Sequence, residues 1–186
     1  MRVLMALSGG VDSSTALGLL CKQLRKNNDN NDKIERLEAA YIKTWMHEDS
    51  PIGDCSWRED IEDGRAVCEK LGVPFEVVNL IGEYEKHVVK MLIEGYAKGI
   101  TPNPDIACNR FIKFGAFLQY GVSKGFTHVA TGHYCQRRQN PDGSFSLLEG
   151  ADPNKDQSYF LAQVSQQQLA HALFPVGGIL KPEVRR

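Results

Sequence analysis

The chain has 186 residues, a length that suits one α/β domain with its own core better than two domains. Its apolar content of 42% and charged content of 24% are ordinary for globular proteins, which excludes a disordered, collagenous or coiled-coil protein. A net charge of −1 argues only weakly against a nucleic-acid partner. No apolar run approaches the ~20 residues that span a bilayer, and we expect a cytoplasmic protein without a membrane partner.

The charges are unevenly distributed along the chain. Between Glu48 and Asp63, acidic residues accompany a single basic residue, Arg58, whereas residues 106–141 contain no acid at all. The basic residues of that second stretch are Arg110, Lys113, Lys124, Arg137 and Arg138. The stretch would attract a polyanion, but a solvated surface that merely lacks acids explains it equally well.

Four apolar runs predict strands, and they alternate with four segments of helical spacing. The predicted strands are residues 2–7, 37–44, 74–80 and 127–131, and the predicted helices are residues 13–25, 57–71, 84–96 and 109–124. Strands that alternate with helices of this length form a parallel sheet joined by right-handed crossovers. The sequence therefore predicts the α/β fold class, as a Rossmann-like parallel sheet with helices on both faces.

Further segments lie outside that alternation. Residues 27–33 predict an exposed polar insertion. Residues 134–138 and 144–148 flank a turn and predict a small hairpin that projects from the sheet. Lys181–Arg186 has the character of a first helical turn, with Pro182 near its start. We therefore expect a C-terminal helical segment, at a point where a longer protein would continue.

The string Ser8–Ser14 directly follows the first strand and opens the first helix. Its two glycines permit a tight turn and let backbone amides approach an anion, and the helix N-terminus adds unpaired amides. Hydroxyl groups of Ser8, Ser13 and Ser14 supply further donors, whereas Asp12 suits a helix cap or a magnesium-associated group. A capped strand–helix turn explains parts of this string but not all of it, so we predict a nucleotide-phosphate site.

The five cysteines form neither a disulfide framework nor a repeated zinc pattern, so no metal site is expected. Cys108 follows a proline-stiffened loop and is predicted to lie where a helix begins, with Asn109 as the cap. The helix amides and the nearby charges of Arg110 and Lys113 would lower its thiol pKa, which makes it the best nucleophile candidate. Cys21 and Cys68 fit buried apolar positions, and Cys55 and Cys135 stay undecided.

Two of these strings resemble known families. Ser8–Ser14 resembles the PP-loop of the ATP pyrophosphatase superfamily, whose members cleave ATP to AMP and pyrophosphate while adenylating a carbonyl oxygen. Thr101–Phe114, which contains Asn-Pro-Asp-Ile-Ala-Cys-Asn-Arg, resembles the signature of the tRNA-specific 2-thiouridylases. Further blocks match that family in the same order, namely Thr131–Tyr134, Lys155–Leu161, Leu173–Gly177 and Lys181–Arg185.

The resemblance implies an adenine nucleotide alpha hydrolase-like fold and a tRNA-uridine 2-sulfurtransferase. Such an enzyme uses ATP, expected with Mg²⁺, to adenylate the wobble uridine of tRNA and replaces its oxygen by sulfur. The sulfur would come as a persulfide from a sulfur relay protein or a cysteine desulfurase. The implied domains are residues 1–165, an ATP-binding adenylating domain, and residues 166–186, which begin a linker to a central domain that this chain lacks.

The resemblance also implies a role for individual positions. The implied ATP contacts are Ala6, Leu7, Ser8, Gly9, Gly10, Val11, Asp12, Ser13, Ile42 and Gly132. The implied target-base contacts are Asn103, Pro104 and Asp105, and further tRNA contacts are Lys155, Asp156 and Gln157. The implied catalytic residues are Cys108 and Asp12.

One part of the family's machinery is missing from this sequence. The family's second, persulfide-carrying cysteine lies beyond the counterpart of Lys181–Arg185, where this chain ends. We therefore expect ATP binding and slow adenylation at most, without complete thiolation by this chain alone. Two alternatives remain open: a PP-loop enzyme that adenylates a small molecule, and a catalytically incomplete fragment that binds ATP or tRNA.

Overall fold

The computed structural model describes residues 1–26, 33–45 and 56–186. The predicted polar insertion lies outside the described residues except for Lys33. The first part of the acidic stretch and Cys55 also lie outside them. In the part of the chain that is described, no helix has the length and apolar character needed to cross a bilayer.

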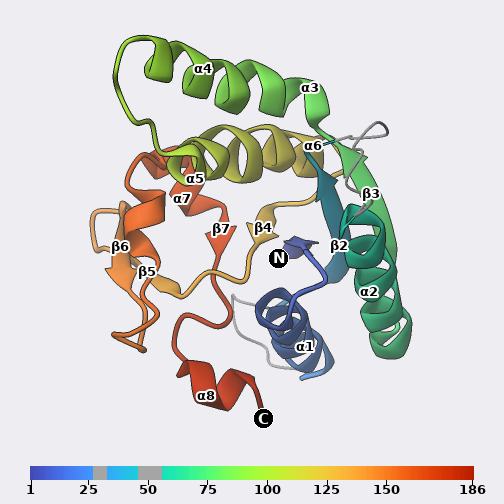
Figure 1. Ribbon diagram of the computed structural model, residues 1–186. Coiled ribbons are helices and arrows are strands. Elements are labelled where there is room, and N and C mark those ends of the chain that lie inside the picture. The colour runs from blue at the N-terminus through green and yellow to red at the C-terminus, as the bar shows by residue number, and fades with distance from the viewer. Residues whose placement is uncertain (27–32, 46–55) are drawn as a thin grey trace.

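A parallel sheet of five strands in the order β3-β2-β1-β4-β7 forms the centre of the structure (Figure 1). These strands are β1 (Arg2–Ala6), β2 (Arg36–Lys43), β3 (Phe75–Asn79), β4 (His128–Ala130) and β7 (Ala172–Leu173). The prediction of an α/β fold with four parallel strands is confirmed. The fifth strand, β7, was not predicted, because a strand of two residues is too short to show a period.

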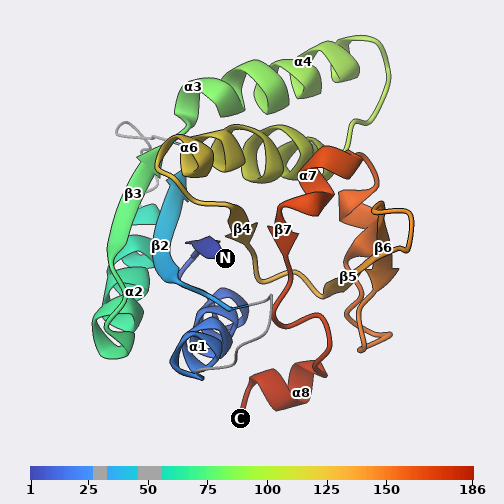
Figure 2. The ribbon, with the colours of Figure 1, turned by 180° about the vertical axis from the view of Figure 1, so that it is seen from behind.

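Helices cover both faces of the sheet, as Figures 1 and 2 show from opposite sides. One face packs against α1 (Val11–Arg25) and α2 (Ser56–Leu71). On the other side of the sheet lie α3 (Ile81–Tyr84), η1 (Glu85–Val89), α4 (Lys90–Ala97), α5 (Pro104–Ala107), η2 (Cys108–Ala116) and α6 (Phe117–Ser123). Of these, α6 contacts the sheet at β4, and α3 and η1 pack against η2. The first three of these six segments follow one another directly, and so do the last three, and η1 and η2 are π-helical.

The central strand β1 explains why both layers form. Successive side chains of a strand point to opposite faces, so an uninterrupted apolar strand must be buried on both sides. Val3 and Met5 belong to the core on the α1 side, together with Leu17. Leu4 belongs to the core on the other side, where it packs with Phe117. The apolar run at residues 2–7 therefore determines the three-layer architecture.

The helix predicted to start at Asn109 begins five residues earlier, at Pro104. Its N-cap is Asn103, whose Oδ1 accepts hydrogen bonds from the backbone N–H groups of Asp105 (3.0 Å) and Ile106 (3.3 Å). The prediction that Asn109 caps the helix is therefore wrong. Asn-Pro is a common helix start, because proline at the first helical position loses no hydrogen bond.

The predicted hairpin is confirmed as β5 (Cys135–Gln139) paired antiparallel with β6 (Phe145–Glu149). The chain then forms η3 (Ser158–Leu161) and α7 (Gln166–Ala170), adds β7 beside β4, and ends in α8 (Lys181–Val184). Apolar side chains of this last part, including Val176 and Val184, are buried in the core that contains α1. The C-terminal segment is thus packed onto the same body as the N-terminal strand.

Gly177 provides a test of this packing. A Cβ atom at Gly177 would lie 1.7 Å from the backbone carbonyl oxygen of Cys135, whereas one at the neighbouring Gly178 would meet only the end of a glutamine side chain at 3.9 Å. We expect Gly177→Ala to lower the free energy of unfolding by about 1–3 kcal/mol or more, because backbone must move. Urea unfolding should show almost no change for Gly178→Ala. Equal stability of the two variants would contradict the packing described.

Candidate functional site

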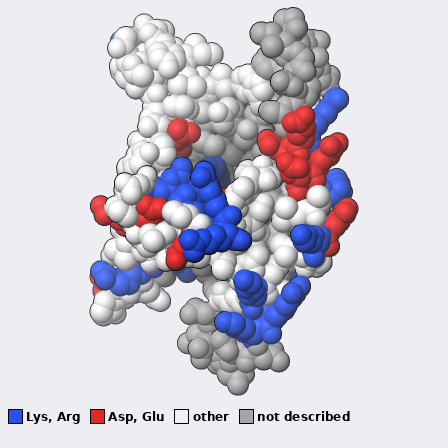
Figure 3. Space-filling view, turned by 60° about the horizontal axis from the view of Figure 1, so that its bottom comes forward, with Lys and Arg blue, Asp and Glu red and all other residues white. Residues whose placement is uncertain are grey.

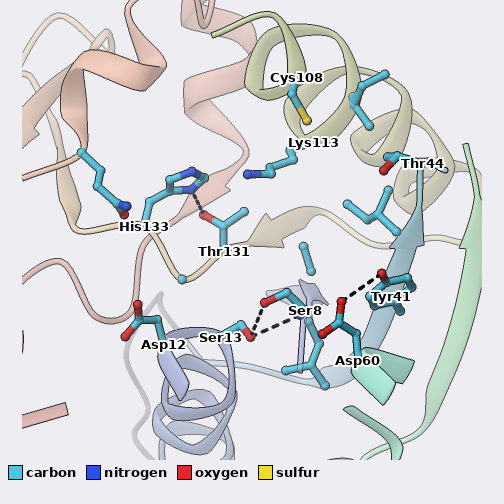
Figure 4. A pocket seen from close by; sticks show the side chains of 16 residues that line it. Ser8, Asp12, Ser13, Tyr41, Thr44, Asp60, Cys108, Lys113, Thr131 and His133 are labelled. Carbon is cyan, nitrogen blue, oxygen red and sulfur yellow. Dashed lines mark hydrogen bonds between the residues drawn. The ribbon is translucent and has the colours of Figure 1, made fainter. Parts of the chain in front are cut away.

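A cavity of about 360 Å³ opens at the carboxyl ends of β1, β2 and β4 (Figure 4). The chain passes from β1 to β2 and β3 on one side and returns to β4 on the other, so the strand order reverses at this point. Ligands of open α/β sheets bind in the crevice at such a reversal. The polar residues and Cys108 that line the cavity are Ser8, Asp12, Ser13, Tyr41, Thr44, Asp60, Cys108, Lys113, Thr131, His133 and Gln157.

The loop between β1 and α1 forms one wall of the cavity and is held by its own hydroxyl groups. Ser13 Oγ donates to the carbonyl oxygen of Gly10 at 3.0 Å and accepts the backbone N–H of Ser8 at 3.2 Å. Gly10 is the N-cap of α1 and makes no side-chain capping bond. The first amides of this 15-residue helix therefore remain available to an anion.

Two glycines let other backbone segments approach this loop. Gly9 has a φ of +79°, and a Cβ atom there would lie 2.7 Å from the carbonyl oxygen of Asp60 on α2. Gly132 follows β4, and a Cβ atom there would lie 2.9 Å from the backbone nitrogen of Ser13. Both positions require glycine, one for its conformation and both for the close approach.

Of the implied ATP contacts, those that line the cavity are Ala6, Leu7, Ser8, Asp12, Ser13, Ile42 and Gly132. Gly9, Gly10 and Val11 do not line it, but Gly9 and Gly10 form the turn and Val11 opens α1. The structure thus brings together positions from three strand ends that lie far apart in the sequence. In this arrangement the N-terminus of α1 is positioned to bind an anion the size of a phosphate, and the side chain of Ile42 is positioned to pack against a flat apolar group.

Asp12 lies in the first turn of α1, so the interpretation of Asp12 as a helix cap is wrong. Its Oδ1 accepts a hydrogen bond from the buried Tyr134 hydroxyl at 2.8 Å and forms an ion pair with the ammonium group of Lys181. The hydrogen bond to Asp12 and burial of the ring both raise the Tyr134 pKa, burial having the larger effect. Through Lys181, the C-terminal segment therefore contacts the first turn of α1 directly.

Cys108 lies across the cavity from Ser8 and Ser13, with its sulfur directed toward the open space (Figure 4). Because the helix begins at Pro104, Cys108 is one turn inside it, and its own N–H is bonded to carbonyl oxygens of that turn. Burial raises the pKa of the Cys108 thiol, Asp105 adds to the rise, and Lys113 opposes it. The prediction of a lowered thiol pKa is therefore wrong, because desolvation outweighs the nearby positive charge.

The three implied target-base residues lie at the start of the same helix. Asn103 and Asp105 are exposed, and Pro104 is half-buried. None of the three lines the cavity described above, but they precede Cys108 by about one helical turn. The Oδ1 atom of Asn103 already serves as the helix cap, so its amide group is the part that remains for another partner.

The three implied tRNA contacts Lys155, Asp156 and Gln157 have different surroundings in the structure. Gln157 lines the cavity, and its Oε1 accepts the backbone N–H of Tyr134 at 3.1 Å. Asp156 holds its own loop together, because its carboxylate accepts the N–H groups of Gly150 (2.9 Å) and Ser158 (3.2 Å). Lys155 is half-buried and does not line the cavity.

Several cavity residues were not selected as site residues from the sequence. Tyr41 and Asp60 meet at the end of β2, where the Tyr41 hydroxyl donates to Asp60 Oδ2 at 3.4 Å. Thr131 Oγ1 and His133 Nδ1 lie 2.8 Å apart at the end of β4. The position of Tyr41, Thr131 and His133 at the ends of predicted strands was the available signal, whereas Asp60 belongs to a predicted helix and gave none. Lys113 was considered only for its charge.

His133 is buried and uncharged. Burial, with a smaller contribution from the positive charge of Lys113, lowers its pKa from 6.5 to about 3. At neutral pH the imidazole therefore presents one donor and one acceptor nitrogen instead of a positive charge. Its ring lies near those of Phe114 and Phe174.

The surface charges fall into separate areas (Figure 3). Acidic side chains gather on the side of α2, which carries the described part of the acidic stretch, Glu59, Asp60, Glu62 and Asp63. Lysine and arginine side chains form other groups on the same face. The described part of the acidic stretch therefore remains together on the folded surface, with basic side chains beside it.

Comparison with known proteins identifies the family. A family model described as the tRNA methyl transferase HUP domain matches residues 1–186. The chain belongs to this family. A tRNA-specific 2-thiouridylase MnmA from Akkermansia muciniphila is 49% identical over 184 residues, which is 99% of this chain and 48% of that protein. One of the same name from Flavobacterium johnsoniae is 47% identical over 99% of this chain and 45% of that protein.

The chain therefore spans about half the length of the curated relatives it matches. Among solved structures, a predicted subunit of tRNA methyltransferase from Methanocaldococcus jannaschii aligns with the whole chain and 73% of its own, with a TM-score of 0.52 and 15% identity. At that identity the likeness concerns the fold alone. It agrees with the Rossmann-like parallel sheet described above.

The charges around Cys108 predict how fast its thiol reacts. Because burial and Asp105 raise its pKa, alkylation by iodoacetamide should be slow at neutral pH and should accelerate as the pH rises. Asp105→Asn should lower the pKa and speed alkylation, whereas Lys113→Met should raise it and slow alkylation, each by about 2- to 10-fold. Peptide mass spectrometry reports the modification at Cys108 alone. Changes of the same sign in both variants would contradict these charge effects.

The buried His133 predicts a loss of stability in acid. Between pH 6.5 and about 3 the unfolded chain carries a proton on this residue that the folded chain does not. The free energy of unfolding should therefore fall as the pH falls through this range, by at most about 1.4 kcal/mol per pH unit from this group. Urea unfolding of His133→Gln should show a shallower pH dependence than the wild type. An unchanged slope would mean that His133 titrates normally.

Proposed function

We propose that this chain is the ATP-dependent adenylating part of a tRNA-uridine 2-sulfurtransferase. One observation carries the proposal: the anion-binding loop at Ser8–Ser14 and the thiol of Cys108 face the same cavity from opposite sides (Figure 4). A nucleotide and a nucleophilic sulfur can therefore act on one reacting group. The names of the relatives support tRNA as the substrate.

The first step is transfer of AMP to the substrate. The amides of α1 and the hydroxyls of Ser8 and Ser13 bind the phosphates, and Ile42 packs against the adenine. The oxygen on carbon 2 of a uridine, turned out of the anticodon, attacks the α-phosphorus, and pyrophosphate leaves. Asn103 and Asp105, at the exposed start of the Cys108 helix, hydrogen-bond the edge of that base. AMP then provides the leaving group that the uridine oxygen lacked.

The second step requires sulfur from outside the described cavity. A sulfur relay protein or a cysteine desulfurase supplies the sulfur, which is carried as a persulfide on the second cysteine that the family resemblance implies. The Cys108 thiolate attacks the inner sulfur of that persulfide, so that a disulfide between Cys108 and the second cysteine forms and hydrosulfide is released. The hydrosulfide attacks carbon 2, and AMP departs with the oxygen. Because the Cys108 pKa is raised, the thiol is protonated at neutral pH, and its proton must be removed before the attack on the persulfide.

The residues of the cavity suit a nucleotide that binds with Mg²⁺. The described residues contain no group of three or more potential protein ligands for a metal ion. Mg²⁺ in nucleotide sites takes one or two carboxylates in addition to phosphate oxygens. Asp12 and Asp60 are the two carboxylates that line the cavity, and Asp60 and the Oδ2 atom of Asp12, whose Oδ1 contacts Tyr134 and Lys181, would hold the ion. The ion would neutralise phosphate charge.

We assign residues 1–165 to the adenylating domain, and we propose that residues 166–186, whose strand β7 and buried Val176 and Val184 pack on that domain, lead to a central domain. The remaining tRNA contacts fall on Lys155, Asp156 and Gln157, and the protein acts in the cytoplasm. This chain spans about half the length of its relatives, which supports a second candidate function: a fragment that binds ATP and tRNA without completing catalysis. The Asn-Pro-Asp-Ile-Ala-Cys string disfavours a small-molecule substrate.

A transfer assay with ATP radiolabelled in its α-phosphate tests the proposal. Incubation with tRNA should place label on the tRNA and release pyrophosphate only when tRNA is present. Cys108→Ser should keep adenylation within a few-fold, because the thiol acts after AMP transfer. Ser13→Ala should weaken ATP binding about 5- to 20-fold, since it loses a hydroxyl that faces the cavity and also orders the loop.

Ser14→Ala is the matched control for Ser13→Ala. Ser14 Oγ also donates to the carbonyl oxygen of Gly10, at 2.9 Å, but Ser14 does not line the cavity. Its ATP affinity should stay close to that of the wild type. Pyrophosphate release that requires no tRNA would favour a small-molecule substrate, and binding without any label transfer would favour the non-catalytic fragment.

A further inference from the structure

Lys113 is the cationic side chain among the described residues that line the cavity. The two acidic residues of the lining are Asp12 and Asp60, and the imidazole of His133 is neutral at physiological pH. Lys113 is half-buried, and it forms no ion pair with the carboxylates of the described residues. An ammonium group that is half-buried, directed into a cavity and unpaired with any carboxylate of the described residues is available to an anionic ligand.

The π-helical segment explains why Lys113 reaches this cavity from the same helix as Cys108. In an α-helix two residues five positions apart lie ~140° apart around the axis and face different sides. Residues 108–116 form a π-helix, whose i→i+5 hydrogen bonds bring residues five apart onto neighbouring sides. Cys108 and Lys113 consequently line the same cavity. Such wide turns are frequent at functional sites.

The position of Lys113 relative to the loop indicates what it contacts. The N-terminus of α1 lies on the far wall, where Ser8 and Ser13 would bind the terminal phosphates. The reacting carbon must come close to Cys108 on the near wall. The α-phosphate joins these two points, and Figure 4 shows the Lys113 side chain extending into the space between Cys108 and His133.

We propose that Lys113 is a further catalytic residue, which contacts the α-phosphate of the bound nucleotide during both AMP transfer and AMP departure. The inference rests on the function proposed above and names a residue of that same site. Negative charge at the α-phosphoryl group must be stabilised when the uridine oxygen attacks it and again when AMP leaves with that oxygen. A fixed ammonium group in a partly closed cavity stabilises such charge more than water does.

Binding of three ligands tests this contact without requiring any reaction. The affinities of the wild type, Lys113→Met and Lys113→Arg are measured by calorimetry for ATP, AMP and adenosine. We expect Lys113→Met to weaken ATP and AMP by a similar factor of about 10 to 100 and to leave adenosine unchanged, because only the α-phosphate is common to the two weakened ligands. Lys113→Arg should retain most of the affinity, since it keeps the charge.

Lys124→Met is the matched control variant. Lys124 lies directly after α6, at the end of the same run of helix, is exposed, and is not among the cavity residues. It should bind all three ligands as the wild type does. Thermal unfolding of both methionine variants shows whether a change in affinity comes from a loss of folding.

Three outcomes would overturn the inference. A loss confined to ATP would place Lys113 at the terminal phosphates, and an equal loss for adenosine would indicate a general change of the site. If Lys113→Met bound ATP and AMP as tightly as the wild type, Lys113 would not contact the α-phosphate and would act only on the pKa of the Cys108 thiol. The proposed function is judged separately, by transfer of AMP from the wild-type protein to tRNA, so its failure is distinguishable from that of the Lys113 contact.

Discussion

The close approach of the segment after β4 to the first turn of α1 is the constraint on which the site depends. Gly132 permits it, because a side chain there would lie 2.9 Å from the backbone nitrogen of Ser13. The approach places the helix N-terminus beside the carboxyl ends of both β1 and β4. Thr131 and His133, on either side of Gly132, are thereby brought to the same cavity as the loop. Because Gly132 has no side chain, two segments that are more than a hundred residues apart in the sequence can pack against each other.

The architecture could be predicted from the sequence where burial leaves a regular pattern. The apolar run at residues 2–7 and its three counterparts gave the parallel sheet, and the glycines and serines of the first loop indicated an anion site. Strand β7 could not be predicted, because its two residues acquire their conformation from pairing with β4. Strands whose own sequence shows an apolar run can thus be predicted. A strand such as β7, which forms only through its tertiary contacts, cannot be predicted from a local pattern.

The site was harder to predict, and the errors have physical causes. The start of the Cys108 helix was misplaced because the Asn-Pro signal at residues 103–104 was attributed to a loop. The thiol pKa was then predicted in the wrong direction, since helix amides and nearby cations are visible in a sequence whereas desolvation is not. The shared position of Cys108 and Lys113 also escaped prediction, because residues five apart share no face in the α-helical pattern on which such arguments rest.

The charges of the cavity explain why the C-terminal segment belongs to the site. An ATP molecule carries several negative charges, and the cavity adds the carboxylates of Asp12 and Asp60. Lys113 offsets only part of this charge, and His133 and Cys108 are held neutral by burial. Lys181, 169 residues from Asp12 in the sequence, forms an ion pair with it. The ion pair lowers the negative charge beside the loop, so under the proposed function Lys181 reduces the repulsion between Asp12 and a bound phosphate.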